Sequence, residues 1–145
     1  MAIGGFGPAV SIAAGGHTLG RKLDGTAWGW GPGTDGRLGN GDTAQRHAPT
    51  TVSGLTGVLE VSAGASHSMA VKGDGTAWAW GNNGQGRLGD GTTNRLTPVQ
   101  VVGPTGVTAV SAGESHSLAL KNDGTVWAWG NNAQSRLGDG TPTAG

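Results

Sequence analysis

Residues 62–92 read SAGASHSMAVKGDGTAWAWGNNGQGRLGDGT, and the stretch returns at residues 111–141 as SAGESHSLALKNDGTVWAWGNNAQSRLGDGT, with seven of 31 aligned positions different. A more divergent copy, AAGGHTLGRKLDGTAWGWGPGTDGRLGNGDT, occupies residues 13–43. Matching histidines mark the period, because His17, His67 and His116 lie 50 and then 49 residues apart. A fixed period of this length indicates an architecture of stacked copies of one structural unit.

Each copy predicts four short antiparallel strands. In the second copy, residues 58–64 form a β-type run, and residues 67–72 alternate with a period of two. Asp74-Gly75 can supply the positive φ angles of a tight hairpin turn, and residues 76–80 return as the third strand. After a longer loop, residues 98–102 predict an outer strand whose first residue is a proline, where no ladder donor is lost.

Four strands in each repeat predict an all-β fold, a β-propeller of four-stranded antiparallel blades. A β-solenoid fits less well, because it favours a shorter repeat without a central hairpin. We expect one repeat domain over residues 1–145, with blades at about residues 9–57, 58–106 and 107–145. The last blade would be completed by a strand at residues 1–5 of a neighbouring chain.

Three Trp-x-Trp pairs stand at matching positions in the predicted third strands. Because the two tryptophans of a pair are two residues apart in a strand, both rings lie on one face, and small residues lie on the other. We expect the pairs to pack between blades, although stacking on a sugar or light sensing is an alternative use of such residues. The pairs are Trp28 and Trp30, Trp78 and Trp80, and Trp127 and Trp129.

The repeated motif, SAG-x-SHS-(Leu/Met)-Ala-(Leu/Val)-Lys-x-Asp-Gly-Thr-x-Trp-Ala-Trp-Gly-Asn-Asn followed by Arg-Leu-Gly-Asp-Gly-Thr, closely resembles the regulator of chromosome condensation repeat. Its form is similar to the bacterial branch of that family, which includes a β-lactamase inhibitory protein. The resemblance implies seven blades of four strands, whereas this sequence has three repeats. Family members include a nucleotide exchange factor, an ultraviolet photoreceptor and enzyme inhibitors, so the resemblance indicates fold more than function.

The two ends of the chain predict ring closure through self-association. Aligned with the third repeat, Met1, Ala2 and Ile3 fall at an outer-strand position, and the third repeat has no outer strand of its own. We expect these residues to pair with the strand of Trp127 and Trp129 in a neighbouring copy. Two chains would form a six-bladed homodimer and three a nine-bladed ring, while propellers typically have 4–8 blades. An excised or designed propeller fragment without a ligand is the alternative.

Composition narrows the classes of function. The formal net charge is zero and no basic stretch occurs, so we expect no nucleic-acid partner. Cysteine is absent, which excludes thiolate metal sites. No run of 18 apolar residues occurs, and the first ten residues lack the pattern of a secretory signal, so we expect no membrane span and leave the compartment open.

The repeated polar residues predict structure more than chemistry. A metal-binding ring of His17, His67 and His116 would need separate blades to share one ion, so we expect each histidine to pack between blades and to bind backbone groups at its own turn. Adjacent Ser and His residues point to opposite faces of a strand and cannot form a catalytic pair. The Asp-Gly-Thr loops do not match calcium motifs, and the repeated arginines are expected to hold the loops in place.

We therefore expect a non-enzymatic scaffold for protein–protein interaction that needs no cofactor. A carbohydrate- or small-ligand-binding propeller, with equal sites between blades, is the alternative, and an enzyme inhibitor would be a special case of the scaffold. A protein partner would contact one rim, at loops that differ between the repeats. These loops are Pro32 to Gly36, Asn40 to Ala48, Asn82 to Gly86 and Asn131 to Ser135.

Overall fold

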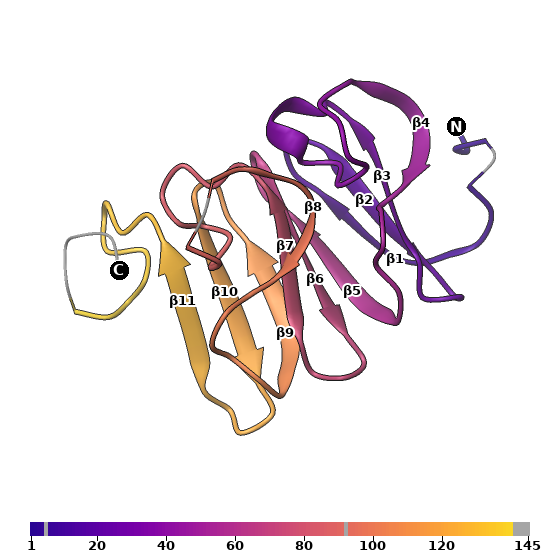
Figure 1. Cartoon of the computed structure of the whole chain (residues 1–145). Helices are drawn as coiled ribbons and strands as arrows, with labels where there is room; N and C mark the ends of the chain where they lie inside the picture. Colours follow the sequence, from indigo (N-terminus) through magenta and orange to yellow (C-terminus); the bar gives the residue numbers. More distant parts are fainter. Residues whose placement is uncertain (5, 92, 141–145) are drawn as a thin grey trace.

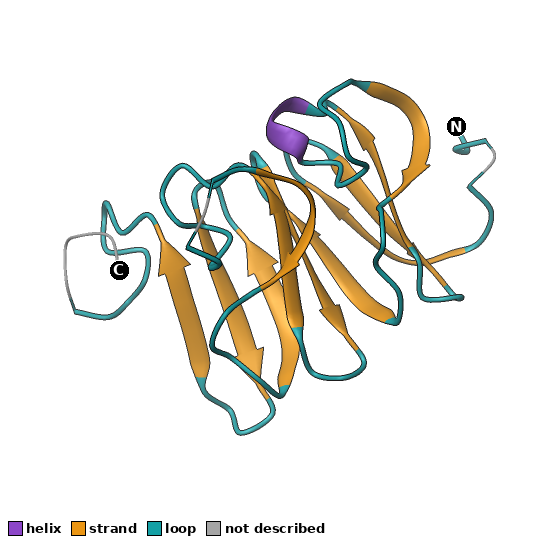
Figure 2. Cartoon of the chain, viewed as in Figure 1, coloured by secondary structure: helices purple, strands orange, loops and turns teal. Residues whose placement is uncertain are grey.

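A computed structural model describes residues 1–4, 6–91 and 93–140, and it contains three antiparallel β-sheets that stand side by side (Figures 1 and 2). The all-β propeller prediction is confirmed at the level of the sheets. Sheet 1 comprises β1 (Ala9–Ala14), β2 (Thr18–Lys22), β3 (Ala27–Gly31) and β4 (Arg46–Thr51). Sheet 2 comprises β5 (Val58–Ala63), β6 (His67–Lys72), β7 (Ala77–Gly81) and β8 (Arg95–Gln100). Sheet 3 comprises β9 (Val107–Ala112), β10 (His116–Lys121) and β11 (Val126–Gly130).

Across the described residues the helical content is one 3₁₀ turn, η1 (Thr34–Gly36), and no helix is long and apolar enough to cross a membrane. The strands of each sheet follow one another in chain order, as expected for a meander of hairpins. The first residues of the chain lie on the side of sheet 1 that faces away from sheet 2 (Figure 1). The three sheets therefore form an open arc, and at each end one sheet face is not covered by another sheet.

The Asp-Gly turns between the second and third strands are three-residue loops, and not two-residue turns with a positive φ at both Asp and Gly. In sheet 2, the amide of Gly75 donates to the carbonyl of Lys72 at 3.0 Å, and the amide of Lys72 donates to the carbonyl of Thr76 at 3.0 Å. Only the glycine has a positive φ, +83°, so the turn combines a β-turn with a left-handed glycine. The Asp74 carboxylate accepts from the amide of Thr76 at 3.0 Å and from its hydroxyl at 2.6 Å, which rigidifies the return strand.

The outer strand of sheet 2 begins earlier than predicted. β8 starts at Arg95, so Pro98 lies inside the strand and not at its first residue. The pairing register shifts between Ala79 and Gly81, opposite this part of β8. Because β8 is an edge strand with a local bulge, the missing amide of the proline removes no regular ladder bond.

Two apolar layers hold the sheets together. The layer between sheets 1 and 2 contains Leu19, Val61 and the fully buried Trp80, and the layer between sheets 2 and 3 contains Met69, Val71 and Leu88. The indole of Trp80 lies against Gly39, where an added Cβ would come within 2.7 Å of the indole nitrogen. A bulky face on one sheet thus fits a face of small residues on the sheet before it.

The N-terminal segment covers part of the open face of sheet 1. The Phe6 side chain is 5% exposed and makes edge-to-face contacts with Trp28 and Trp30, with ring centroids 5.9 and 5.4 Å away. Met1 and Ile3 are exposed and lie outside any strand. Their expected pairing partner belongs to a second chain, so the closure by residues 1–5 stays a prediction, and residue 5 lies outside the described residues.

Candidate interaction surfaces

A histidine, a serine and a main-chain carbonyl connect each pair of neighbouring sheets. His17 Nε2 of sheet 1 lies 2.5 Å from Ser68 Oγ of sheet 2, and Ser68 Oγ donates to the carbonyl of Arg37 in sheet 1's loop at 2.7 Å. One junction further, His67 Nε2 lies 2.8 Å from Ser117 Oγ, which donates to the carbonyl of Arg87 at 2.6 Å. We call this three-part arrangement the clasp.

Counting protons in the clasp determines the histidine tautomer. A serine hydroxyl has one hydrogen, and here that hydrogen goes to the arginine carbonyl, so the serine must accept from histidine Nε2–H. The neutral ring then has no hydrogen on Nδ1, and the Nδ1 atoms of His17 and His67 are buried without a hydrogen-bond partner. The ring therefore cannot take a proton from the serine, and the pair cannot work as base and nucleophile.

Burial keeps both clasp histidines neutral. Desolvation, helped by the positive charge of Arg37, lowers the pKa of His17 from 6.5 to about 4. Desolvation, with Arg87 as the next cause, lowers the pKa of His67 from 6.5 to about 3. A second proton would sit on Nδ1, which is buried without a hydrogen-bond partner, and this burial is the main physical reason for the shift in pKa.

The repeated arginines extend across the junctions as well. Arg37 Nε donates to the carbonyl of Thr34 in its own loop at 2.9 Å, and Nη1 donates to the carbonyl of Ala65 in sheet 2's turn at 3.1 Å. Arg87 Nη1 donates to Ser66 Oγ of its own sheet at 2.8 Å and to the carbonyl of Glu114 in sheet 3's turn at 3.3 Å. Each arginine therefore holds its loop and also contacts the next sheet.

Side-chain amides add a further contact at the rim. Asn82 Nδ2 and Asn94 Nδ2, both from sheet 2's loop, donate to the two carboxylate oxygens of Asp35 in sheet 1's loop at 2.9 and 3.1 Å. At the next junction Asn131 Nδ2 donates to Gln85 Oε1, at the position that matches Asp35. The rim loops that we expected to differ between repeats thus also bind one another.

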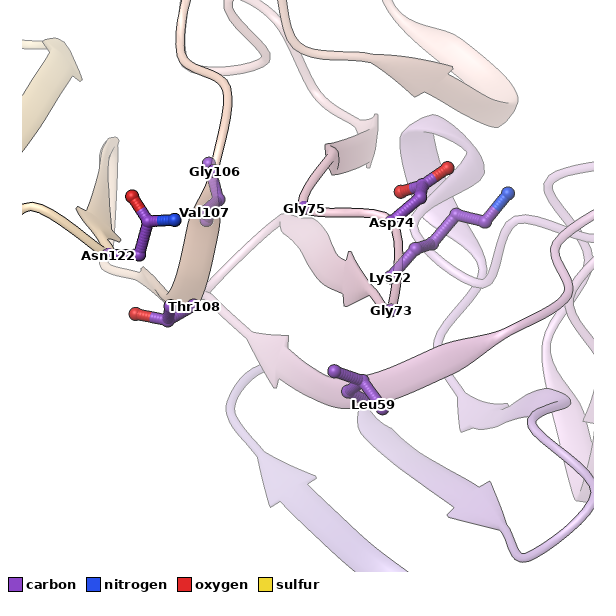
Figure 3. Close-up of a pocket in the computed structure, with 9 residues that line it drawn as sticks. All are labelled: Leu59, Lys72, Gly73, Asp74, Gly75, Gly106, Val107, Thr108 and Asn122. Atoms are coloured by element: carbon purple, nitrogen blue, oxygen red, sulfur yellow. The ribbon is translucent and has the colours of Figure 1, made fainter.

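The opposite end of each junction is closed by the hairpin turns. Val107 N donates to the carbonyl of Gly75 at 2.8 Å, as Val58 N donates to the carbonyl of Gly25 at 3.0 Å one sheet earlier. Figure 3 shows the hollow of about 350 Å³ beside this contact, with Asn122 on one side and Asp74 on the other. Its polar lining side chains, those of Lys72, Asp74, Thr108 and Asn122, are partly or fully exposed.

The open faces of sheets 1 and 3 expose residues that are buried at matching positions inside the arc. On sheet 3, Leu120 is 41% exposed, whereas Val71 at the matching position of sheet 2 is fully buried. On sheet 1, Ile12 is 75% exposed, whereas the matching Val61 is 7% exposed. Each open face carries an apolar hollow, of about 400 Å³ beside Ile12 and Trp30 and about 240 Å³ beside Leu118 and Leu120.

The predicted site residues divide between these surfaces. Trp80, His17 and His67 are buried at the two internal junctions, while Trp28, Trp30 and Trp78 are partly buried. Trp129 Nε1 donates to the carbonyl of Arg87 at 2.9 Å, and Trp127 is 43% exposed. His116 is partly buried in sheet 3. Among the described residues no three His, Asp or Glu side chains form a metal-binding group.

Sequence reasoning missed the clasp. It assigned the histidines to backbone groups of their own turns, but each buried ring binds a serine of the next sheet. The available signal was the hydroxyl residue that directly follows each of the three repeated histidines, namely Thr18, Ser68 and Ser117. Because adjacent residues in a strand face opposite ways, that serine had to serve a different histidine from its own neighbour.

Sheets stacked in an arc and joined by a repeated junction define a repeat protein of the β-propeller class. The chain belongs to the regulator of chromosome condensation (RCC1) repeat family. One model of this repeat matches residues 24–71 and 74–120, and a second matches residues 58–87 and 107–135. The placement in a bacterial branch that the sequence suggested stays a prediction.

Solved structures of the same kind resemble the chain over most of its length. Human WBSCR16 is 26% identical with a TM-score of 0.85, over 98% of this chain and 40% of that protein. Yeast RCC1 (Prp20), in its complex with Kap60, is 27% identical with a TM-score of 0.76, over 89% and 31%. Prp20p from Saccharomyces cerevisiae, described with its binding to Gsp1p and histones, is 27% identical with a TM-score of 0.76, over 89% and 32%. The chain thus spans less than half the length of these relatives.

Proposed function

We propose that the chain is a protein-interaction scaffold whose first partner is a second copy of itself, bound head to tail so that two chains close a six-bladed ring. The open face of sheet 3 would bind the open face of sheet 1 of the other copy, at two identical junctions related by twofold symmetry. The proposal fits a family in which yeast Prp20p is described with protein partners. A six-bladed ring lies within the usual range of propellers.

The observation that carries this proposal is that the two open faces carry residues that match, position by position, the two halves of the buried internal junctions. Sheet 3 presents Leu118, Leu120 and Val126, which match the buried Met69, Val71 and Ala77 that cover the next sheet from sheet 2. Val126 is 63% exposed, whereas Ala77 is 1% exposed. Exposed apolar area of this kind favours association, at roughly 25 cal/mol per Å² removed from water.

The other half of the junction is present on sheet 1. Ile12 and Trp30 match Val61 and Trp80, both of which belong to the buried layer between sheets 1 and 2. Phe6 aligns with Leu55, which is 3% exposed in that same layer, where the chain passes from one sheet to the next. The position of Phe6 on Trp30 therefore supports a closing junction built like the internal ones.

The mass in solution tests this proposal, measured by light scattering on the 145-residue chain across a range of concentrations. We expect a species of twice 14.3 kDa. Leu120→Glu would bury a charge in the closing junction and should give monomers. Leu23→Glu is the matched control, because Leu23 is 80% exposed in a hairpin turn, and it should leave the dimer intact. A wild-type chain that stays at 14.3 kDa, or a Leu120→Glu chain that still dimerises, would overturn the proposal.

A further inference from the structure

Each end of the chain carries one half of a clasp. Sheet 3 has the donor half, because His116 and Arg136 match His67 and Arg87. Sheet 1 has the acceptor half, because Thr18 stands where Ser68 and Ser117 stand and also carries a hydroxyl. Within the described part of the chain no sheet follows sheet 3, so its donor half has no serine or threonine from a next sheet to bind.

Contacts within each sheet already position the residues of both half-clasps. Arg136 donates to Ser115 Oγ at 3.3 Å and to Gln134 Oε1 at 3.1 Å, just as Arg87 donates to Ser66 of its own sheet. The Nδ1 atom of His116 is buried without a hydrogen-bond partner, as in the two internal clasps. Thr18 lines the apolar hollow on the open face of sheet 1, beside Trp30.

We propose that a third clasp closes the ring, an inference that rests on the self-association proposed above. His116 Nε2–H donates to Thr18 Oγ1 of the second copy, and this hydroxyl donates to the main-chain carbonyl of Arg136. The Arg136 guanidinium donates to the carbonyl of Gly16 of the second copy, which aligns with Glu114, the acceptor of Arg87. The partner is recognised by a hydroxyl and a carbonyl at fixed spacing within an apolar face.

The closing junction differs from the internal junctions in one respect. Pro32 stands at the position of Asn82 and Asn131, whose side-chain amides bind the neighbouring loop. A proline side chain has no donor, so Gln134 of the other copy, which matches Gln85, receives no amide at this point. The closing junction therefore lacks a rim contact that both internal junctions have, and the third clasp supplies a larger share of its side-chain hydrogen bonds.

The affinity of the dimer tests the third clasp, measured by sedimentation equilibrium for the wild type and single variants. Thr18→Val keeps the shape of the side chain but leaves two buried polar groups unpaired at each of two junctions. We therefore expect the dissociation constant of the dimer to rise at least roughly twentyfold. Thr18→Ser should restore the wild-type affinity. Thr50→Val is the matched control, because Thr50 lies on β4 and its hydroxyl binds the carbonyl of Ala48 in its own strand.

Two more measurements complete the test. In the dimer, nitrogen-detected NMR should show a slowly exchanging Nε2 proton on His116 that is lost in Thr18→Val. Pro32→Asn should supply the missing amide at both junctions and tighten the dimer roughly fourfold or more. A wild type that is monomeric throughout would refute self-association. A wild-type dimer that Thr18→Val leaves unchanged, or that lacks the His116 proton, would refute the third clasp while self-association stands. A dimer that Pro32→Asn does not tighten would refute the weak rim contact at Pro32 and leave the clasp standing.

Discussion

Mild acid should destabilise the fold through the two internal clasps. The pKa of His17 falls from 6.5 to about 4 and that of His67 to about 3, because each ring is buried as the neutral Nε2–H tautomer. In the unfolded chain both rings bind a proton below pH 6.5, whereas the folded rings do not. The contribution of these rings is therefore fully present above pH 6.5 and is lost as the pH falls towards the folded pKa values.

The size of the effect at pH 5 depends mainly on the unfolded state. A ring that ionises at 6.5 when unfolded and stays neutral when folded loses about 2 kcal/mol of stability at pH 5. The two clasps together should lose about 4 kcal/mol, a large part of the 5–15 kcal/mol that is typical of a folded domain. Asp24, Asp74 and Asp123 do not interfere, because hydrogen bonds from threonines lower their pKa values below 3.8, outside this window.

Urea unfolding followed by tryptophan fluorescence measures this loss, at one protein concentration and at about pH 8 and about pH 5. His67→Gln retains a donor for Ser117 but cannot ionise, so the difference between the two pH values should fall to about half. His47→Gln removes an exposed histidine of β4 and serves as the control, with the full difference expected. A wild-type difference below about 1 kcal/mol would refute the neutral, Nε2-protonated clasp.

Three pairs of substitutions test other parts of the junctions by the same urea unfolding. Gly89 and Gly91 both have φ of +72°, but an added Cβ at Gly89 would lie 2.9 Å from the indole nitrogen of Trp129, whereas at Gly91 it would meet nothing within 4 Å. Gly89→Ala should therefore lower the free energy of unfolding more than Gly91→Ala does, and equal losses would contradict the close packing. Ser117→Ala should cost about 2–3 kcal/mol of stability, because it leaves the buried Nε2–H of His67 without an acceptor and removes the hydrogen bond to the carbonyl of Arg87. Ser117→Thr should cost less, and an unchanged stability of Ser117→Ala would argue against the clasp. Trp80→Ala should lower the free energy of unfolding by about 3–5 kcal/mol. Trp127 is 43% exposed in one chain, so in the Leu120→Glu background, which is expected to be monomeric, Trp127→Ala should cost less than half as much. The reverse order would contradict the packing assignment.

The fold could be predicted because each local sequence signal of secondary structure occurs at matching positions in all three repeats. Asp-Gly at the hairpin, the Trp-x-Trp alternation and the glycines recur in register, and the structure places four-stranded sheets where two of the repeats predict them. The start of β8 was missed because proline usually marks the first residue of a strand. Here a bulge at an edge strand tolerates Pro98 three residues further in, and the sequence carries no separate signal for that bulge.

The junction chemistry could be predicted only in part, because it joins residues about 50 positions apart. Periodicity indicated that His67 has a structural role, but a local pattern cannot say whether its ring binds its own turn or Ser117 of the next sheet. The same holds for Arg87, which binds its own sheet as expected and also binds the turn of the next one. Contacts between stacked repeats follow from how the sheets are superposed, which strand patterns do not encode.

In the proposed dimer, the N-terminal segment would prepare the open face of sheet 1 for the second copy. Phe6 already lies on Trp30, at the position that Leu55 takes between sheets 1 and 2, so closing a ring would not require it to move. Fixing such a side chain in advance lowers the entropy that association must overcome, which is about 0.5–1.5 kcal/mol for each ordered side chain. Thr18 remains accessible beside it, in the hollow on the same face. In that dimer the apolar contact would already be in place on sheet 1 before the second copy binds, and His116 and Arg136 of the second copy would add the polar contacts that determine register.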